Sequence, residues 1–332
     1  MNKTISFYLP EKVLDNDELV ELYSGWTTEK IFNKTGIKRR HISGKDEYTS
    51  DMAIKAANKL FGEYKIEIKE IEFLIVITQG PDYLIPTTAC IIQDKLGLST
   101  SCGAFDINLG CSGYIYGLSV AKSLIISKTA DVVLLITADV YTKFIHDMDR
   151  STRTIFGDGA TATLINKNNV NDIGSFVFGT NGAGSDKLII PNSGARSMST
   201  KNKSIINSEN CENSRTDRNI YMDGTEIFKF TIETVPNAIY DVLKKNSLKI
   251  SDIDLFVFHQ ANKFMLDYLR KTIGIPEDKF YINIADIGNT VSSTIPIALK
   301  MAYSEGILRE GHLVMLVGFG VGLSWGATIM KW

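Results

Sequence analysis

Residues 104–118, AFDINLGCSGYIYGL, pass from a short apolar run into helical spacing around a single cysteine. The run before the first glycine predicts a buried strand. Tyr114 and Leu118, four residues apart, begin a repeat that predicts a helix. The glycines on both sides of Cys111 allow the backbone to turn sharply between the two elements. This strand–turn–helix unit predicts an α/β fold and places Cys111 at its turn.

The position of Cys111 favours a reactive thiol. A side chain at the start of a helix lies among unpaired backbone N–H groups and the positive end of the helix dipole, both of which favour a thiolate. Free cysteines are also common as small buried side chains, so this stretch alone leaves both interpretations open.

The composition of the 332-residue chain is typical of a globular protein with a large core, with 44% hydrophobic and 22% charged residues. The net charge of −2 argues against a nucleic-acid-binding surface. The sequence has no apolar run of 18 residues and no signal-peptide pattern at its start, so we expect a cytoplasmic protein without a membrane span. The four cysteines show no C-x-x-C spacing, so neither a metal site nor a disulfide framework is predicted.

Apolar runs typical of strands buried on both faces alternate with helical patterns along the chain. The strands are expected at residues 71–78, 131–138, 253–260 and 312–320, and the helices near 52–61, 87–96, 113–127, 235–245, 263–272 and 294–304. Such alternation predicts mainly parallel or mixed sheets covered by helices.

The order of these elements repeats in the two halves of the chain. Residues 56–78, AANKLFGEYKIEIKEIEFLIVIT, are similar to residues 238–260, AIYDVLKKNSLKISDIDLFVFHQ. A duplicated α/β unit explains the pattern, although two ordinary strand–helix units could also coincide. We expect the halves to meet near residues 165–172, with an N-terminal half at 1–168 and a C-terminal half at 169–332.

Three further segments have expected roles outside the repeat. Residues 192–219 are rich in Ser, Asn and Lys and predict an exposed insertion containing Cys211. Residues 156–164, FGDGATATL, lack the order of a nucleotide-binding loop and predict a structural glycine turn. Cys90, in a helical run, is expected in the core.

Two polar residues of the second half are candidates for the same site as Cys111. His259 ends a predicted buried strand, at the edge where α/β sheets bind ligands. Asn289 follows Gly288 at a predicted helix start, near the counterpart of Cys111 in the duplicated frame. A hydrogen-bonded core histidine and a helix-capping asparagine are the alternatives.

Nearly the whole chain resembles the β-ketoacyl-acyl-carrier-protein synthase III family of thiolase-like condensing enzymes. The similarity runs through YLPEKVLDN, KTGIKRRHI, IPTTACIIQDKLG, AFDINLGCSGY, DRSTRTIFGDGA, YMDGTEIFK, HQAN, GNTVSSTIPIAL and GFGVGLSWGA. It implies a five-layered α-β-α-β-α fold and a catalytic triad of Cys111, His259 and Asn289. It also implies a homodimer in which Ile85, the first residue of IPTTAC in the loop before the predicted helix, reaches the acyl pocket of the partner.

The resemblance implies a decarboxylating condensation. Cys111 takes an acyl group from a thioester, and the backbone N–H groups of Cys111 and Val321 stabilise the oxyanion. Malonyl-acyl carrier protein then loses carbon dioxide, and neutral donors on His259 and Asn289 stabilise its enolate before the new carbon–carbon bond forms. The substrates are acyl-carrier or acyl-CoA thioesters, and no cofactor is implied.

Some residues expected to bind substrate depart from the family pattern. Lys30 and Lys34 stand where relatives that use acyl-CoA carry Trp and Arg, and Phe264 replaces an Arg after HQAN. Arg150 keeps an adenine-stacking position, and Asn262 of HQAN is expected to line the site. A lysine cannot stack or bind bidentately, so these departures favour an acyl-carrier donor and leave acyl-CoA open.

Other activities fit the same residues. A relative in a specialised pathway would move the acyl group to a hydroxyl, an amine or a non-malonyl nucleophile, and a hydrolase would release a free acid. A scaffold without turnover is disfavoured by the intact triad. Lys263, Arg270 and Lys271 are candidate contacts for an acidic carrier protein, or simply a solvated helix face.

Overall fold

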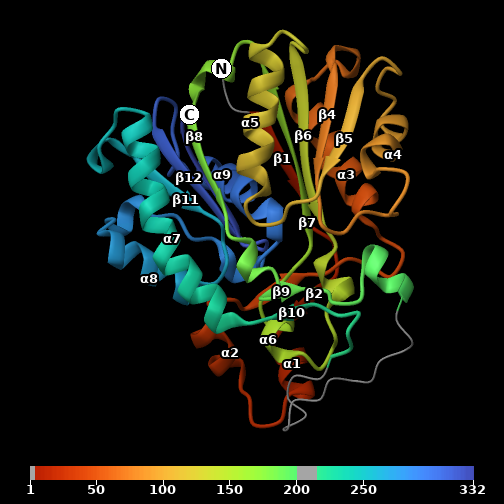
Figure 1. Cartoon of the computed structure of the whole chain (residues 1–332), viewed down its shortest axis with the longest axis vertical. Helices are drawn as coiled ribbons and strands as arrows, with labels where there is room; N and C mark the ends of the chain where they lie inside the picture. The colour runs from red at the N-terminus through yellow and green to blue at the C-terminus, as the bar shows by residue number, and fades with distance from the viewer. Residues whose placement is uncertain (1–3, 200–214) are drawn as a thin grey trace.

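The computed structural model describes residues 4–199 and 215–332. Within this part of the chain, two large sheets stand side by side, with helices between them and on their outer faces (Figure 1). None of the helices in the described ranges is long and apolar enough to cross a membrane. The same residues contain no group of three or more His, Cys, Asp or Glu side chains arranged to hold a metal ion.

The first sheet has the strand order β1-β7-β6-β4-β5. β4 is parallel to both β5 and β6, whereas β7 is antiparallel to β6 and β1. The strands are β1 (Thr4–Tyr8), β4 (Phe73–Ile77), β5 (Gly103–Ile107), β6 (Val132–Asp139) and β7 (Gly159–Asn166). The apolar run before Cys111 is thus the edge strand β5.

The second sheet repeats this topology. Its order is β11-β12-β13-β8, with β11 parallel to β12 and the other neighbours antiparallel. Phe280 makes an isolated parallel bridge to Phe256 of β11, at the place that β5 takes beside β4. The strands are β8 (Ile173–Thr180), β11 (Leu255–Phe258), β12 (Leu313–Gly320) and β13 (Ser324–Lys331). The matching orders confirm a duplicated architecture.

The helices form three layers around the two sheets. α3 (Thr49–Tyr64) and α4 (Thr88–Lys95) cover the first sheet, and α7 (Gly224–Lys245) and α8 (Lys263–Ile273) cover the second. α5 (Gly113–Ile126) and α9 (Thr294–Ser304) lie between the sheets. Separate apolar cores fill these layers, so the expected five-layered thiolase-like α/β fold is confirmed.

Short elements gather at one end of the sheets (Figure 1). They are β2 (Val13–Asp15), α1 (Asn16–Leu22), α2 (Thr28–Thr35), β3 (Arg39–His41), α6 (Arg150–Arg153), β9 (Leu188–Ile189) and β10 (Tyr221–Met222). The buried Arg40 guanidinium joins several of them by donating to Leu14 O, Asn16 Oδ1 and Thr154 O. Burial lowers the pKa of Arg40 to about 10, which leaves it charged at neutral pH.

Most of the expected elements are present, with three differences. α7 begins at Gly224 rather than near residue 235, because the Asp223 side chain accepts from Glu226 N and caps a longer helix. Cys90 is exposed rather than in the core. In the 192–219 segment, Cys211 lies outside the described residues, and Asn192 is buried and donates to Asp217 Oδ2.

Candidate active site

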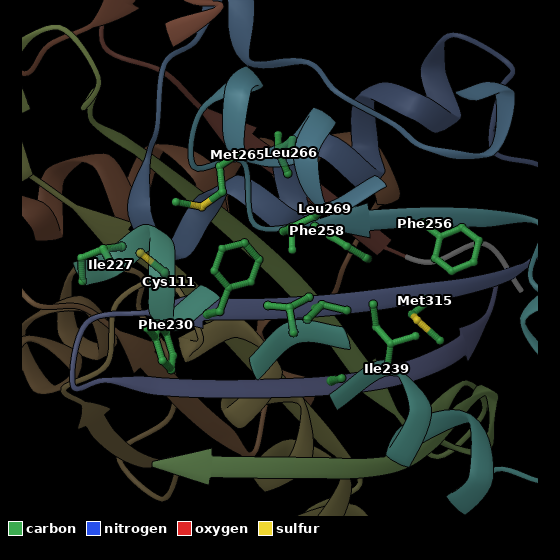
Figure 2. Close-up of a cluster of buried hydrophobic side chains, with 14 of the residues drawn as sticks. Cys111, Ile227, Phe230, Ile239, Phe256, Phe258, Met265, Leu266, Leu269 and Met315 are labelled. Carbon is green, nitrogen blue, oxygen red and sulfur yellow. The ribbon is translucent and has the colours of Figure 1, made fainter. Parts of the chain in front are cut away.

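Cys111, His259 and Asn289 line one cavity of about 120 Å³, although each comes from a different part of the chain. All three are buried. Figure 2 shows Cys111 at one end of the apolar core of the second half, near Ile227 and Met265, which also line the cavity. A mostly apolar cavity with a few converging polar groups is the usual form of a ligand site.

Cys111 lies in the turn between β5 and α5, where Gly113 N donates to Gly110 O at 2.7 Å. Burial, reinforced by the nearby Asp139 carboxylate, raises the pKa of Cys111 to about 12. The backbone N–H groups of Val321 and Cys111 face the thiol and oppose this shift in pKa without reversing it. Contrary to the expectation from the helix start, the resting group is therefore a thiol.

His259 follows β11 and is held from two sides. Its backbone N–H donates to Val317 O at 2.8 Å, and its Nδ1 lies 2.7 Å from Thr294 Oγ1. Phe319 packs at right angles against the imidazole ring. Burial lowers the pKa of His259 to about 3, so the imidazole is neutral at physiological pH.

The backbone of Asn289 is fixed by the glycine turn of the first half. Asn289 N donates to Ile155 O at 3.0 Å, and Gly157 N donates to Asn289 O at 2.9 Å. A Cβ atom at Gly157 would lie 2.9 Å from Ile287 O, so a larger residue would push the two segments apart. The turn predicted to be structural thus also positions Asn289, which the sequence did not reveal.

The side-chain amide of Asn289 has a defined orientation. Its Oδ1 accepts from Val291 N at 2.9 Å, so its Nδ2 points the other way. Nδ2 lies 3.3 Å from Ala261 O and 3.5 Å from His259 Nε2. The amide donor of Asn289 and Nε2 of His259 therefore face the same part of the cavity.

Gly320 and Val321, at the end of β12, lie against the Cys111 thiol. A Cβ atom at Gly320 would lie 2.9 Å from Cys111 Sγ, so only glycine leaves this side of the thiol open. Because the N–H groups of Val321 and Cys111 both face the thiol, two backbone donors converge where an oxyanion would form.

Asp139, which sequence analysis missed, links the two halves beneath the cavity. Its carboxylate accepts from Gln79 N at 2.8 Å and from Ser292 N at 3.2 Å. Gln79 follows β4 of the first half, and Ser292 follows Asn289 in the second. Asp139 therefore holds the Asn289 loop against the strand ends near Cys111.

The other predicted substrate residues are scattered. Asn262 lines the Cys111 cavity, and its Oδ1 caps α8 by accepting from Met265 N. Phe264 is 61% exposed and lies in a separate groove between α2 and α8. Ile85 is 86% exposed and does not line the Cys111 cavity in the described chain.

Lys34 and Arg150 meet around Trp26, a residue that sequence analysis missed. Arg150 Cζ lies 4.3 Å from the centre of the indole ring, and Lys30 Nζ and Lys34 Nζ each lie 4.8 Å from it. Trp26 and Arg150 are far apart in sequence, and nothing in the spacing indicated that they would stack. The result is a cationic surface site with one aromatic ring.

The duplicated fold and the convergence of a thiol, an imidazole and an amide define the class of the protein as a thiolase-like condensing enzyme. Comparison with known proteins agrees. The model of the 3-oxoacyl-[acyl-carrier-protein] synthase III family matches residues 105–182, and the model of its C-terminal region matches residues 243–332.

Relatives that match over nearly their whole length belong to the same family. A Clostridium perfringens protein named β-ketoacyl-[acyl-carrier-protein] synthase III is 39% identical over 99% of this chain and 98% of its own, and its Clostridium tetani counterpart is 38% identical over 98% and 96%. A crystal structure of a 3-oxoacyl-(acyl-carrier-protein) synthase III is similar with a TM-score of 0.95 and 45% identity, covering 99% of this chain and 98% of that one.

A Thermus thermophilus enzyme of the same name has a TM-score of 0.85 and 35% identity, with coverage of 99% and 98%. The chain therefore belongs to the β-ketoacyl-acyl-carrier-protein synthase III family, and it is an acyltransferase of that type.

Proposed function

We propose that Cys111, His259 and Asn289 catalyse the condensation of an acyl thioester with malonyl-acyl carrier protein, with loss of carbon dioxide, in fatty-acid biosynthesis or a related pathway. The observation that carries the proposal is the convergence of these three side chains on one cavity, with two neutral nitrogen groups beside the thiol. Thioesters supply both carbon units, so the chemistry requires no further cofactor.

In the first half-reaction, Cys111 Sγ attacks the carbonyl carbon of the acyl thioester. Because burial raises the pKa of Cys111 to about 12, the attack needs a base. Neutral His259 lines the same cavity and accepts the thiol proton at Nε2, with its ring proton on Nδ1. The backbone N–H groups of Cys111 and Val321 stabilise the tetrahedral oxyanion. The proton then passes to the leaving thiol, and the acyl group stays on Cys111.

In the second half-reaction, the malonyl group loses carbon dioxide and leaves an enolate in the cavity. Asn289 Nδ2 and His259 Nε2 stabilise the enolate oxygen. For His259 to donate, its single ring proton must first move from Nδ1 to Nε2 through solvent, and the Thr294 hydroxyl then turns to donate to Nδ1. The enolate carbon attacks the acyl-Cys carbonyl, and the carbon–sulfur bond breaks. Cys111 leaves as a thiolate and takes up one proton from water.

The exposed loop before α4 supports a homodimer. Tyr83, Leu84 and Ile85 are 61%, 77% and 86% exposed, an unusual position for three large apolar side chains in a row. The neighbouring strand β5 forms an edge of the first sheet. An open edge beside an apolar loop is a surface that a second copy of the chain would cover.

The carrier protein is proposed to dock where the Cys111 cavity opens, near α8. Two of the three basic residues predicted as contacts there already pair within the chain, Lys263 with Asp267 and Arg270 with Glu277. Lys271 lines the groove between α2 and α8 together with Phe264. We therefore expect Lys271 to contribute more than the other two to recognition of an acidic carrier.

Mass spectrometry of the acyl-enzyme tests the proposal. Full-length protein is incubated with acyl thioesters, weighed, and then supplied with malonyl-acyl carrier protein. We expect one acyl group on the wild type and on the Cys90→Ala, Cys102→Ala and Cys211→Ala controls, and none on Cys111→Ala. Labelling of the Cys111→Ala protein would refute the assignment.

The second addition separates the candidate reactions. A β-ketoacyl product supports the condensing enzyme, whereas release of a free acid indicates a hydrolase. An acyl-enzyme that persists in the presence of malonyl-acyl carrier protein indicates transfer to another nucleophile.

A further inference from the structure

A second cavity, of about 240 Å³, lies next to the cavity that holds the triad. Leu188 lines both cavities. Val321, whose backbone N–H faces the Cys111 thiol, lines the second. We call this second space the acyl cavity, and define it by the side chains of Gln79, Asn108 and Tyr141 together with Leu188 and Val321.

The proposed condensation needs one cavity for the malonyl thioester and another for the acyl chain. His259 and Asn289 lie in the first cavity, which must admit the malonyl thioester while Cys111 already carries its acyl group. The acyl chain therefore needs a different space beside the nucleophile. The acyl cavity borders the residues that flank Cys111 and is the described space that meets this need.

The wall of the acyl cavity nearest the nucleophile is polar. A Cβ atom at Gly110 would lie 2.5 Å from Gln79 Oε1, so the Gln79 carboxamide packs directly against the residue before Cys111. The buried Tyr141 hydroxyl donates to Gln79 Oε1 at 3.0 Å. This hydrogen bond fixes the carboxamide with its oxygen toward Tyr141, so its Nε2 faces away from the tyrosine.

Donor groups at this wall lack protein partners. Gln79 is half-buried and Asn108 is exposed, so before a ligand binds water can reach both amides. Among residues 4–199 and 215–332 of one chain, no group accepts a hydrogen bond from Gln79 Nε2, and the Asn108 side chain makes no hydrogen bond. A plain alkyl chain would cover these amides and leave them unpaired, which is unfavourable. An oxygen atom on the acyl chain would accept from Gln79 Nε2 instead.

The lack of charged residues around the cavity limits the chemical class of the ligand further. None of the described residues that line it carries a charge, because burial raises the pKa of Tyr141 well above its usual value and keeps its hydroxyl neutral. The Asp139 carboxyl accepts from the backbone N–H of Gln79. A carboxylate on the acyl chain would enter without a cation to pair with it. The ligand oxygen is therefore a hydroxyl or a carbonyl.

We propose that the acyl cavity selects a primer acyl group bearing an uncharged oxygen over a plain alkyl group of the same length, with Gln79 as the specificity-determining residue and Tyr141 as the residue that positions it. This inference rests on the proposed function, because it concerns the acyl group that Cys111 carries.

Competition between matched thioesters tests the inference. Wild-type protein receives equimolar butyryl and 3-hydroxybutyryl thioesters of one carrier protein, or equimolar pentanoyl and 4-oxopentanoyl thioesters, and the two acyl-Cys111 masses are compared. We expect the oxygenated group to dominate by about tenfold in at least one pair, the scale of one hydrogen bond. Equal labelling in both pairs, or a preference for the alkyl groups, would overturn the inference.

Variants then assign the preference to its residues. Gln79→Leu should bring the ratio of oxygenated to alkyl labelling close to one, whatever the rate of either, and Tyr141→Phe should lower this ratio independently. Ser193→Ala is the matched control, because its hydroxyl lines the same cavity but already donates to Ile190 O. Loss of the preference in the control, or its survival in Gln79→Leu, would refute the role of Gln79. Absence of labelling by every thioester would instead remove the proposed function, and the inference with it.

Discussion

Asn289 Nδ2 lies 3.5 Å from His259 Nε2, although the two residues are 30 positions apart and enter the cavity from different loops. Val291 N fixes the amide by donating to Asn289 Oδ1, and Thr294 Oγ1 holds the other side of the imidazole. A neutral imidazole and an oriented amide next to each other can both donate hydrogen bonds to an oxygen atom that gains negative charge. A carboxylate at either position could not donate to such an oxygen and would repel it.

Asn289→Asp should separate the two half-reactions. The aspartate still accepts from Val291 N, so the loop is expected to remain in place, but its second oxygen cannot donate and repels an enolate. We expect condensation to slow by about 10²–10³-fold, corresponding to about 3–4 kcal/mol, while acylation of Cys111 changes far less. Single-turnover rates of Cys111 acylation and of condensation measure the two effects separately. Equal losses in both would mean that Asn289 positions the nucleophile instead.

Thr294→Val should disturb the proton on His259. The Thr294 hydroxyl lies 2.7 Å from His259 Nδ1 and 3.1 Å from Val291 O, so by rotating it can donate to either. Valine has the same shape but no hydroxyl, and we expect condensation to slow about tenfold, the scale of a lost buried hydrogen bond.

The conservative variant distinguishes this positioning role from a packing defect. Thr294→Ser keeps the hydroxyl and should restore most of the rate, and the ¹⁵N chemical shifts of the imidazole should report a changed tautomer in Thr294→Val alone. An unchanged ¹⁵N spectrum in Thr294→Val, or no rescue by serine, would assign Thr294 to packing.

The pH dependence of the free energy of unfolding should show that the imidazole of His259 is buried and neutral. Burial lowers the pKa of His259 to about 3, so between pH 6.5 and 3 the unfolded chain binds a proton there that the folded chain does not. The free energy of unfolding should therefore fall as the pH is lowered through this window, by about 1.4 kcal/mol per pH unit from this group. His259→Asn should lack that contribution.

Denaturant unfolding of both proteins at several pH values measures the difference. The Asp139 carboxyl, whose pKa burial raises to about 7, acts in the opposite direction, since the folded chain then holds a proton that the unfolded chain releases. Asp139 is present in both proteins, so subtracting the curves isolates His259. Parallel curves between pH 6 and 4 would contradict the buried neutral histidine.

The sequence predicted the layered fold well because its central strands are buried on both faces. Residues 71–78 and 312–320 are nearly continuous apolar runs, and they became β4 and β12. α7 begins at Gly224 rather than near residue 235 because the side chain of Asp223 caps the helix there, and Pro236 lies inside the helix.

Within the candidate site, the sequence indicated the residues that are proposed to act in catalysis but not the residues that position them. Cys111, His259 and Asn289 follow strands or begin helices, where spacing is informative. Trp26 and Gln79 act through side-chain contacts with residues distant in sequence, and Asn289 depends on backbone bonds to Ile155 and Gly157. Such contacts appear only once the chain has packed.

The last prediction concerns the acyl donor. Lys30 and Lys34 stand where relatives that use acyl-CoA carry a Trp that stacks on adenine and an Arg that binds phosphate bidentately. In this protein both lysines, together with Arg150, lie over the ring of Trp26. An adenine base would have to displace these cations before stacking, and a lost stack or bidentate contact weakens binding by roughly 1–3 kcal/mol. Acylation of Cys111 should therefore be slower from acyl-CoA than from the same acyl group on a carrier protein at matched concentration.

Two variants locate the cause of this preference. Trp26→Ala should leave the acyl-CoA rate within about twofold, because an indole covered by its own cations contributes little stacking to a base. Lys271→Ala should slow loading from the carrier protein and spare loading from CoA, since the docking surface and not the nucleotide is altered. Faster acylation from acyl-CoA in the wild type, together with a tenfold loss in Trp26→Ala, would mean instead that the indole and Arg150 separate to hold adenine between them. The cationic cluster would then be the nucleotide site of the enzyme.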